Sequence, residues 1–138
     1  MRKRSPFIIF PLILLLGLLA FGGCGKTKST DELIGDLKSA QEGDRIKAAR
    51  LLQGRKGDAA KVVPALIESL KDKEGDVRWS AAIGLGYFGE EAKDAIPALQ
   101  AAQRDRDARV RKGAGVALSR IDPARFRPLS KGRSGKGK

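Results

Sequence analysis

The apolar residues between positions 31 and 123 are spaced as they are on amphipathic helices. In one segment, the positions that share an apolar face at i, i+3, i+4 and i+7 are Val63, Leu66, Ile67 and Leu70. Pro64 is expected near the start of this helix, where its missing N–H does no harm. A tight turn follows, after which Asp76 is expected to cap a second helix. The buried face of that second helix is expected at Val77, Ala81 and Leu85.

This helix pair recurs with a period of 33 residues. Residues 63–66 (Val-Pro-Ala-Leu) return at 96–99 as Ile-Pro-Ala-Leu, and Val77-Arg78 returns as Val110-Arg111. A weaker first copy includes Leu33, which precedes Leu66 by the same distance. Tandem units of this length are typical of solenoids, in which each repeat packs on its neighbours. The sequence therefore predicts an all-α fold, a short α-solenoid of about three helix pairs at 31–57, 58–89 and 90–123.

The two stronger repeats resemble the HEAT repeat, in the variety that includes phycobilisome-lyase-like proteins. That pattern has an early proline, an aspartate eight residues later, and Val-Arg opening the second helix. Here it is matched by Pro64, Asp72, Val77 and Arg78, and again by Pro97, Asp105, Val110 and Arg111. The resemblance implies a ladder of polar contacts between adjacent repeats, formed by Asp72, Arg78, Asp105 and Arg111.

The first repeat departs from this pattern. Asp31 replaces the proline and Ser39 stands at the position of the ladder aspartate, whereas Arg45 keeps the arginine position. Terminal repeats are often atypical, because their outer face meets solvent. Residues 31–56 are therefore interpreted as an N-terminal cap repeat.

The first 24 residues predict an export signal. Three basic residues at 2–4 precede an apolar run of 15 residues from Phe7 to Phe21, whereas spanning a bilayer takes roughly 20. The run ends in Phe21-Gly22-Gly23-Cys24, which resembles the lipobox of bacterial lipoproteins. The resemblance implies a signal peptide at 1–23, lipidation of Cys24, a tether at 24–30, and a location in the cell envelope facing the periplasm or exterior. An uncleaved membrane anchor is the alternative.

The net charge of +12 is distributed unevenly. Residues 30–122 contain 17 basic and 16 acidic residues, so the remaining basic residues lie in the leader, the tether and the tail. Residues 124–138 contain few apolar residues and predict a basic disordered tail. This tail and the mildly basic last repeat could bind an anionic polymer or membrane surface. Nucleic acid is disfavoured, because Phe126 is the only aromatic residue in the tail.

The residue types present favour binding over catalysis. The chain has no histidine, its one thiol is at Cys24, and no serine lies in a Gly-x-Ser-x-Gly motif. We expect no enzyme activity, cofactor, metal or small-molecule substrate. We expect a protein partner on the concave face of the stack, lined by the second helices. The candidates on that face are Lys47, Arg50, Trp79, Ile83, Lys112 and Val116.

Two interpretations of Trp79 remain open at this stage. Tryptophan is enriched at interface hot spots, so Trp79 is a candidate anchor for the partner. Large aromatic side chains are also often mostly buried, and Trp79 could simply pack on a neighbouring helix. Tyr87 and Phe88 are expected to close the loop after the second helix as core residues.

Overall fold

The computed structural model describes residues 27–126, and within them the chain forms helices and no strand. The first pair is α1 (Thr30–Asp36) and α2 (Glu42–Leu52), and the second is α3 (Ala59–Ser69) and α4 (Gly75–Phe88). The third is α5 (Ile96–Ala102) and α6 (Ala108–Ile121). Short 3-10 helices, η1 (Lys56–Asp58) and η2 (Gly89–Ala95), precede α3 and α5. The predicted all-α class is confirmed.

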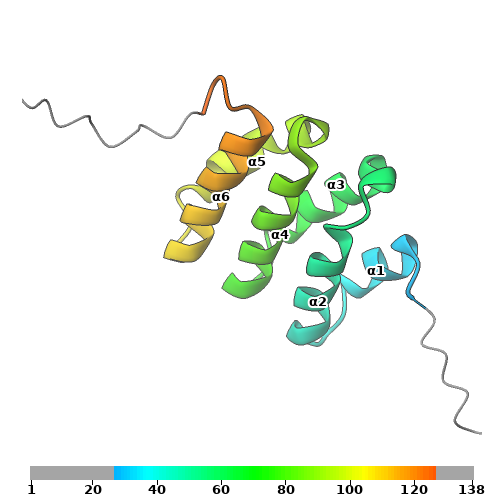
Figure 1. Cartoon of the computed structure of the whole chain (residues 1–138). Coiled ribbons are helices and arrows are strands. Elements are labelled where there is room, and N and C mark those ends of the chain that lie inside the picture. The colour runs from blue at the N-terminus through cyan, green and yellow to red at the C-terminus, as the bar shows by residue number, and fades with distance from the viewer. Residues whose placement is uncertain (1–26, 127–138) are drawn as a thin grey trace, which may run out of the picture.

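The helices form two layers (Figure 1). The second helices α2, α4 and α6 lie side by side in one layer, and the first helices α1, α3 and α5 form the other. The described chain begins at one end of this stack and finishes at the other. This arrangement confirms the predicted short solenoid of three helix pairs.

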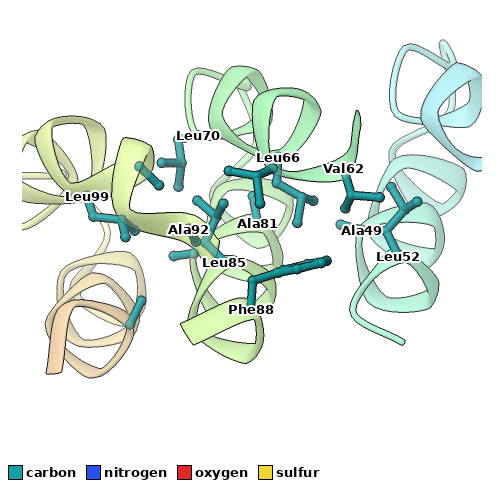
Figure 2. Packing of buried hydrophobic residues seen from close by; sticks show 14 of the residues in the cluster. Ala49, Leu52, Val62, Leu66, Leu70, Ala81, Leu85, Phe88, Ala92 and Leu99 are labelled. Atoms are coloured by element: carbon teal, nitrogen blue, oxygen red, sulfur yellow. The ribbon is translucent and has the colours of Figure 1, made fainter. Parts of the chain in front are cut away.

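The 33-residue period of the sequence reappears in the core, where equivalent residues of successive repeats pack between the two layers. Leucines at equivalent positions of the first helices, and of the second helices, are each at most 1% exposed: Leu33, Leu66, Leu99, Leu52, Leu85 and Leu118. Figure 2 shows Leu66 and Leu85 pointing into the same interior from α3 and α4. Each repeat therefore contributes at least one leucine from each layer to a single continuous core.

Glycines inside the second helices allow those helices to lie close together. A Cβ added at Gly86 of α4 would lie 3.0 Å from Cα of Ala117 in α6, which is backbone that cannot swing aside. A Cβ added at Gly113 of α6 would lie 3.1 Å from the Trp79 ring. A glycine lowers helix stability by about 1 kcal/mol relative to alanine. The close approach of α4 and α6 explains why these helices contain glycine nonetheless.

Two details of the second repeat differ from the expectations. Pro64 lies inside α3, because that helix begins at Ala59, five residues before the proline. Asp76 does not cap α4: the N-cap position is Glu74, and the Glu74 N–H donates to the Asp72 carboxylate at 2.9 Å. The turn is therefore closed by the ladder aspartate.

The ends of the described region also shift two expected boundaries. Thr30, assigned to the tether, is the first residue of α1, and its buried hydroxyl donates to Asp58. Ser29 and Glu32 form a reciprocal capping box at the start of that helix. Phe126, assigned to the tail, packs against the core, and its N–H donates to the Asp122 carbonyl at 3.0 Å. The helical stack thus extends slightly beyond 31–123 at both ends.

The predicted leader, the lipidation site at Cys24 and residues 127–138 of the predicted tail lie outside the described residues. In residues 27–126, none of the helices combines the length and the hydropathy that a bilayer span requires.

Candidate functional site

Arginines of the second helices form ion pairs with aspartates of the following repeat. Arg45 of α2 donates from Nε and Nη2 to the two Asp72 carboxylate oxygens at 2.8 and 3.0 Å. Arg78 of α4 donates in the same way to Asp105 at 2.7 and 2.8 Å. Both pairs join residues 27 positions apart. They form two rungs of a ladder that crosses the interfaces between repeats.

Each ladder arginine is also fixed within its own repeat. Nη1 of Arg45 donates to the Ser39 and Ala40 carbonyls at 3.0 and 3.3 Å. Nη1 of Arg78 donates to the Asp72 and Lys73 carbonyls at 2.8 and 3.0 Å. The guanidinium is thereby oriented before it meets the next repeat, so that little side-chain freedom is lost per hydrogen bond.

The ladder carboxylates are ionised in a largely buried setting, with side chains 12–13% exposed. Burial raises the pKa of Asp72, but the Arg45 guanidinium and the Glu74 N–H outweigh it and hold that pKa below its ordinary value. The Arg78 guanidinium likewise lowers the pKa of Asp105, against the opposing effect of burial. A buried charge is tolerated only when it is paired and hydrogen-bonded, as both carboxylates are here.

The last arginine of the ladder differs from the other two. Nη1 of Arg111 donates to the Asp105 and Arg106 carbonyls at 2.8 and 3.1 Å, as in the preceding repeats. Within residues 27–126 no carboxylate pairs with Arg111, whose residue is exposed. Of the expected ladder residues, Arg111 therefore forms no rung. Arg45 does form one but was not among the expected residues, although it lies 33 positions before Arg78.

The surface of the second helices forms the other candidate site. On α4, the residues that are not fully buried after the first turn are Trp79, Ile83 and Tyr87, spaced by four residues. The residues 33 positions later, on α6, are Lys112, Val116 and Arg120, and Arg50 is equivalent to Ile83 on α2. We call this surface the second-helix face, comprising Arg50, Trp79, Ile83, Tyr87, Lys112, Val116 and Arg120.

Trp79 is held in place by the neighbouring repeat. Its side chain is partly buried, packs against the core and approaches Gly113 of α6. Tyr87, expected as core, is instead 48% exposed, whereas Phe88 is 4% exposed. The Arg120 guanidinium lies 5.3 Å from the centre of the Tyr87 ring. The structure therefore places two aromatic rings on the second-helix face, and sequence reasoning had missed Tyr87 and Arg120 as members of it.

The charge of the second-helix face is positive. Its nearby acidic residue Asp76 is bound by Arg109 at 2.7 Å, and Arg109 also binds Asp107 at 2.9 Å. Within residues 27–126, Arg50, Lys112 and Arg120 take part in no ion pair and are exposed. Three cations without carboxylate partners thus occupy, on α2 and α6, positions equivalent to those of the apolar strip Trp79, Ile83 and Tyr87 on α4.

Lys47 lies elsewhere than the other partner-binding candidates. It borders a groove of about 370 Å³ at the N-terminal end of the stack, together with Asp44, Leu51 and Arg55. The residue 33 positions later is Ser80, which is buried in the interior of the stack. Lys47 therefore occupies the side of α2 that a preceding repeat would cover.

The described residues offer no evident metal site. In the part of the chain from 27 to 126, no three His, Cys, Asp or Glu residues gather closely enough to hold a metal ion. Asp72, Asp105 and Asp107 instead bind arginine side chains. The observed chemistry of these carboxylates is charge pairing.

Comparison with known proteins assigns the chain to the HEAT repeats. The profile of the family described as HEAT repeats matches residues 30–119, and no curated protein matches the chain. A solved structure, the complex of CpcE and CpcF of phycocyanin lyase from Nostoc sp. PCC7120, is similar with 26% sequence identity and a TM-score of 0.64. The similarity covers 72% of this chain and 40% of that one, so this chain spans about two fifths of its relative. The expected resemblance to HEAT repeats of the lyase type is confirmed, and the chain belongs to the HEAT repeat family.

Proposed function

We propose that this protein is a membrane-tethered protein-binding module that recognises an acidic partner on the second-helix face. The observation that carries the proposal is that one helix face presents two aromatic rings while the helices on either side carry three cations without carboxylate partners. Stacked helix pairs form extended surfaces that HEAT-type solenoids use for binding. The fold of the chain is therefore compatible with a scaffolding role.

The chemistry of the face defines the partner. Tryptophan, tyrosine and arginine are the residue types enriched among interface hot spots. Arg50, Lys112 and Arg120 would attract carboxylates and set the orientation of the partner, and such attraction weakens with salt. Trp79 and Ile83 would contact an apolar residue between those carboxylates. The expected ligand is an acidic protein segment with an apolar anchor.

Trp79 is the only tryptophan in the chain, so its fluorescence reports directly on this face. We expect a synthetic amphipathic helix of glutamate and leucine to change the Trp79 emission, with an affinity that falls as salt rises. The double variant Arg50→Glu and Arg120→Glu should weaken this binding at least about tenfold, because two attractive charges become repulsive.

The matched control reverses two exposed lysines away from the face, Lys71→Glu and Lys93→Glu. It should change the affinity less than about twofold, since exposed charges at a distance are screened. A variant lacking 127–138 should retain the affinity if the face, and not the basic tail, binds the peptide. Equal losses in both double variants, or loss on truncation, would argue for the alternative, a binder of anionic polymers or membrane surfaces.

The membrane tether is the part of the proposal that rests on sequence. Its support is the short apolar run that ends in Gly22-Gly23-Cys24. We expect protein extracted from membranes to have the mass of a chain that begins at Cys24 and carries acyl chains. These chains would retain it on the membrane, because each buried methylene contributes about 0.8 kcal/mol to anchoring. The variant Cys24→Ala should lose this mass and its membrane retention. A full-length unmodified mass in the wild type would contradict the tether.

Binding rather than catalysis is likewise a proposal. The chain contains no histidine, and its only cysteine is the expected lipidation site. The phycocyanin lyase complex bears on this point only weakly, because this chain spans about two fifths of the matched chain. What carries over is the stacked-helix architecture on which that complex is built.

A further inference from the structure

The two ends of the arginine ladder are not equivalent. At the N-terminal end, Ser39 occupies the position of an aspartate, so the first repeat offers no carboxylate to a preceding arginine. At the C-terminal end, Arg111 is oriented by two carbonyls at 2.8 and 3.1 Å. The Nε and Nη2 groups, which bind carboxylates in Arg45 and Arg78, make no hydrogen bond within residues 27–126.

The sequence beyond the described region contains no acidic residue to complete this rung. Each existing rung joins residues 27 positions apart, and the residue 27 positions after Arg111 is Lys138. Residues 127–138 contain neither aspartate nor glutamate. A next repeat within this chain would thus present a lysine to Arg111 at the ladder position, which favours a carboxylate from another molecule.

The outer side of α6 has the shape of an interface between repeats. A groove of about 520 Å³ lies beside it, bordered by residues of α5 and α6 and by the segment that follows α6: Gln103, Lys112, Gly115, Val116, Ser119, Arg125 and Phe126. Ser119 is equivalent to Gly86, where an added Cβ would lie 3.0 Å from the α6 backbone, and Val116 is equivalent to Ile83. The next position of the stack thus has small residues where a further helix would approach.

A second copy of this chain does not fit this end. If a copy added its first repeat, it would bring Ser39 to Arg111 instead of a carboxylate. If two copies met by their C-terminal ends, Arg111 would face Arg111. Like charges across an interface disfavour association. The occupant has to be a different protein.

We propose that the C-terminal end of the stack docks a HEAT-like helix pair of a different protein, whose aspartate binds Arg111 as Asp72 binds Arg45. The partner continues the solenoid across the two chains, with its second helix along the groove of α6. This interaction shares Lys112 and Val116 with the second-helix face, but its central contact, Arg111, is not part of that face.

The first experiment asks whether this end accepts a repeat at all. In a four-repeat variant, residues 90–122 are duplicated directly after Asp122, which places the copied aspartate 27 positions after Arg111. We expect the thermal midpoint to rise by about 5 °C or more, since a new nearest-neighbour interface adds stability. Replacing the copied aspartate by serine should remove most of the gain. No gain, or a gain indifferent to that aspartate, would overturn the proposal.

The second experiment identifies the partner in cells that produce the full chain. A photo-crosslinking amino acid is placed at Gln103 beside the groove, and at Lys93 of η2 as the control site. We expect an adduct with a different protein at Gln103 only, reduced at least about tenfold by Arg111→Glu and unaffected by Arg50→Glu. Arg111→Asp, combined with Asp→Arg at the contacting aspartate of the partner, should restore it. No adduct, self-adducts, or adducts indifferent to Arg111 would each overturn the proposal.

Discussion

Replacing Leu85 by alanine is expected to destabilise the protein by about 2–5 kcal/mol, the usual range for a fully buried leucine. Leu85 is 0% exposed and lies in α4, the central second helix, between the two outer repeats. A domain of this size has a free energy of unfolding of only about 5–15 kcal/mol. The substitution would therefore remove a large part of the stability, and urea denaturation followed by circular dichroism would measure the loss.

Leu51 provides a matched control for this substitution. It is also a leucine in a second helix, but its side chain is at the surface and the residue is 48% exposed. Leu51→Ala removes little buried area, so its effect should stay within about 0.5 kcal/mol. If the two variants lost equal stability, the buried row of leucines would not be the main source of cohesion between the layers.

Replacing Arg78 by methionine should be of comparable severity. The substitution leaves the Asp105 carboxylate, 12% exposed, without its guanidinium. Removing one partner of a buried ion pair costs about 3–5 kcal/mol, and the lower end applies here because the Asp107 N–H still donates to Asp105. The control variant is Arg111→Met. It removes the two equivalent hydrogen bonds to carbonyls but no ion pair within residues 27–126. The difference in unfolding free energy between the two variants isolates one rung.

The same rung should depend on pH in a defined direction. Arg78 lowers the pKa of Asp105 in the folded state, so the folded protein binds this proton less readily than the unfolded chain does. The stabilisation is therefore complete above the ordinary pKa of about 3.9 and is lost as pH falls below it. The stability gap between wild type and Arg78→Met should be widest near neutral pH and narrow in acid. A gap that stayed constant down to pH 2 would rule out the pair as its cause.

The repeat architecture could be predicted from the sequence because its determinants recur. Leu66 and Leu99 stand at equivalent positions, and both are fully buried. The ladder aspartates and arginines also lie at fixed spacings that match the HEAT pattern. Three copies of one pattern give the same information three times, which compensates for weak signals in a single helix.

The details that could not be predicted depend on contacts between distant residues. Asp72, Glu74 and Asp76 all lie in one turn, and Asp72 closes it by accepting from the Glu74 N–H, while Arg45 of the previous repeat holds that carboxylate in place. Tyr87 is exposed because its ring lies beside Arg120 of α6 and not in the interior. Neither outcome can be read from the local residues alone.

The positions of the two chain ends have a mechanical consequence. The described chain begins at one end of the stack and finishes at the other, so a pulling force applied to both ends would act on the interfaces between repeats in series. Repeats in such a stack contact only their neighbours, and they would therefore separate one after another. Each released unit of 33 residues could extend to roughly 110 Å, against about 10 Å while stacked. With the proposed lipid anchor before one end and a bound partner at the other, the protein would act as an extensible link that yields in steps.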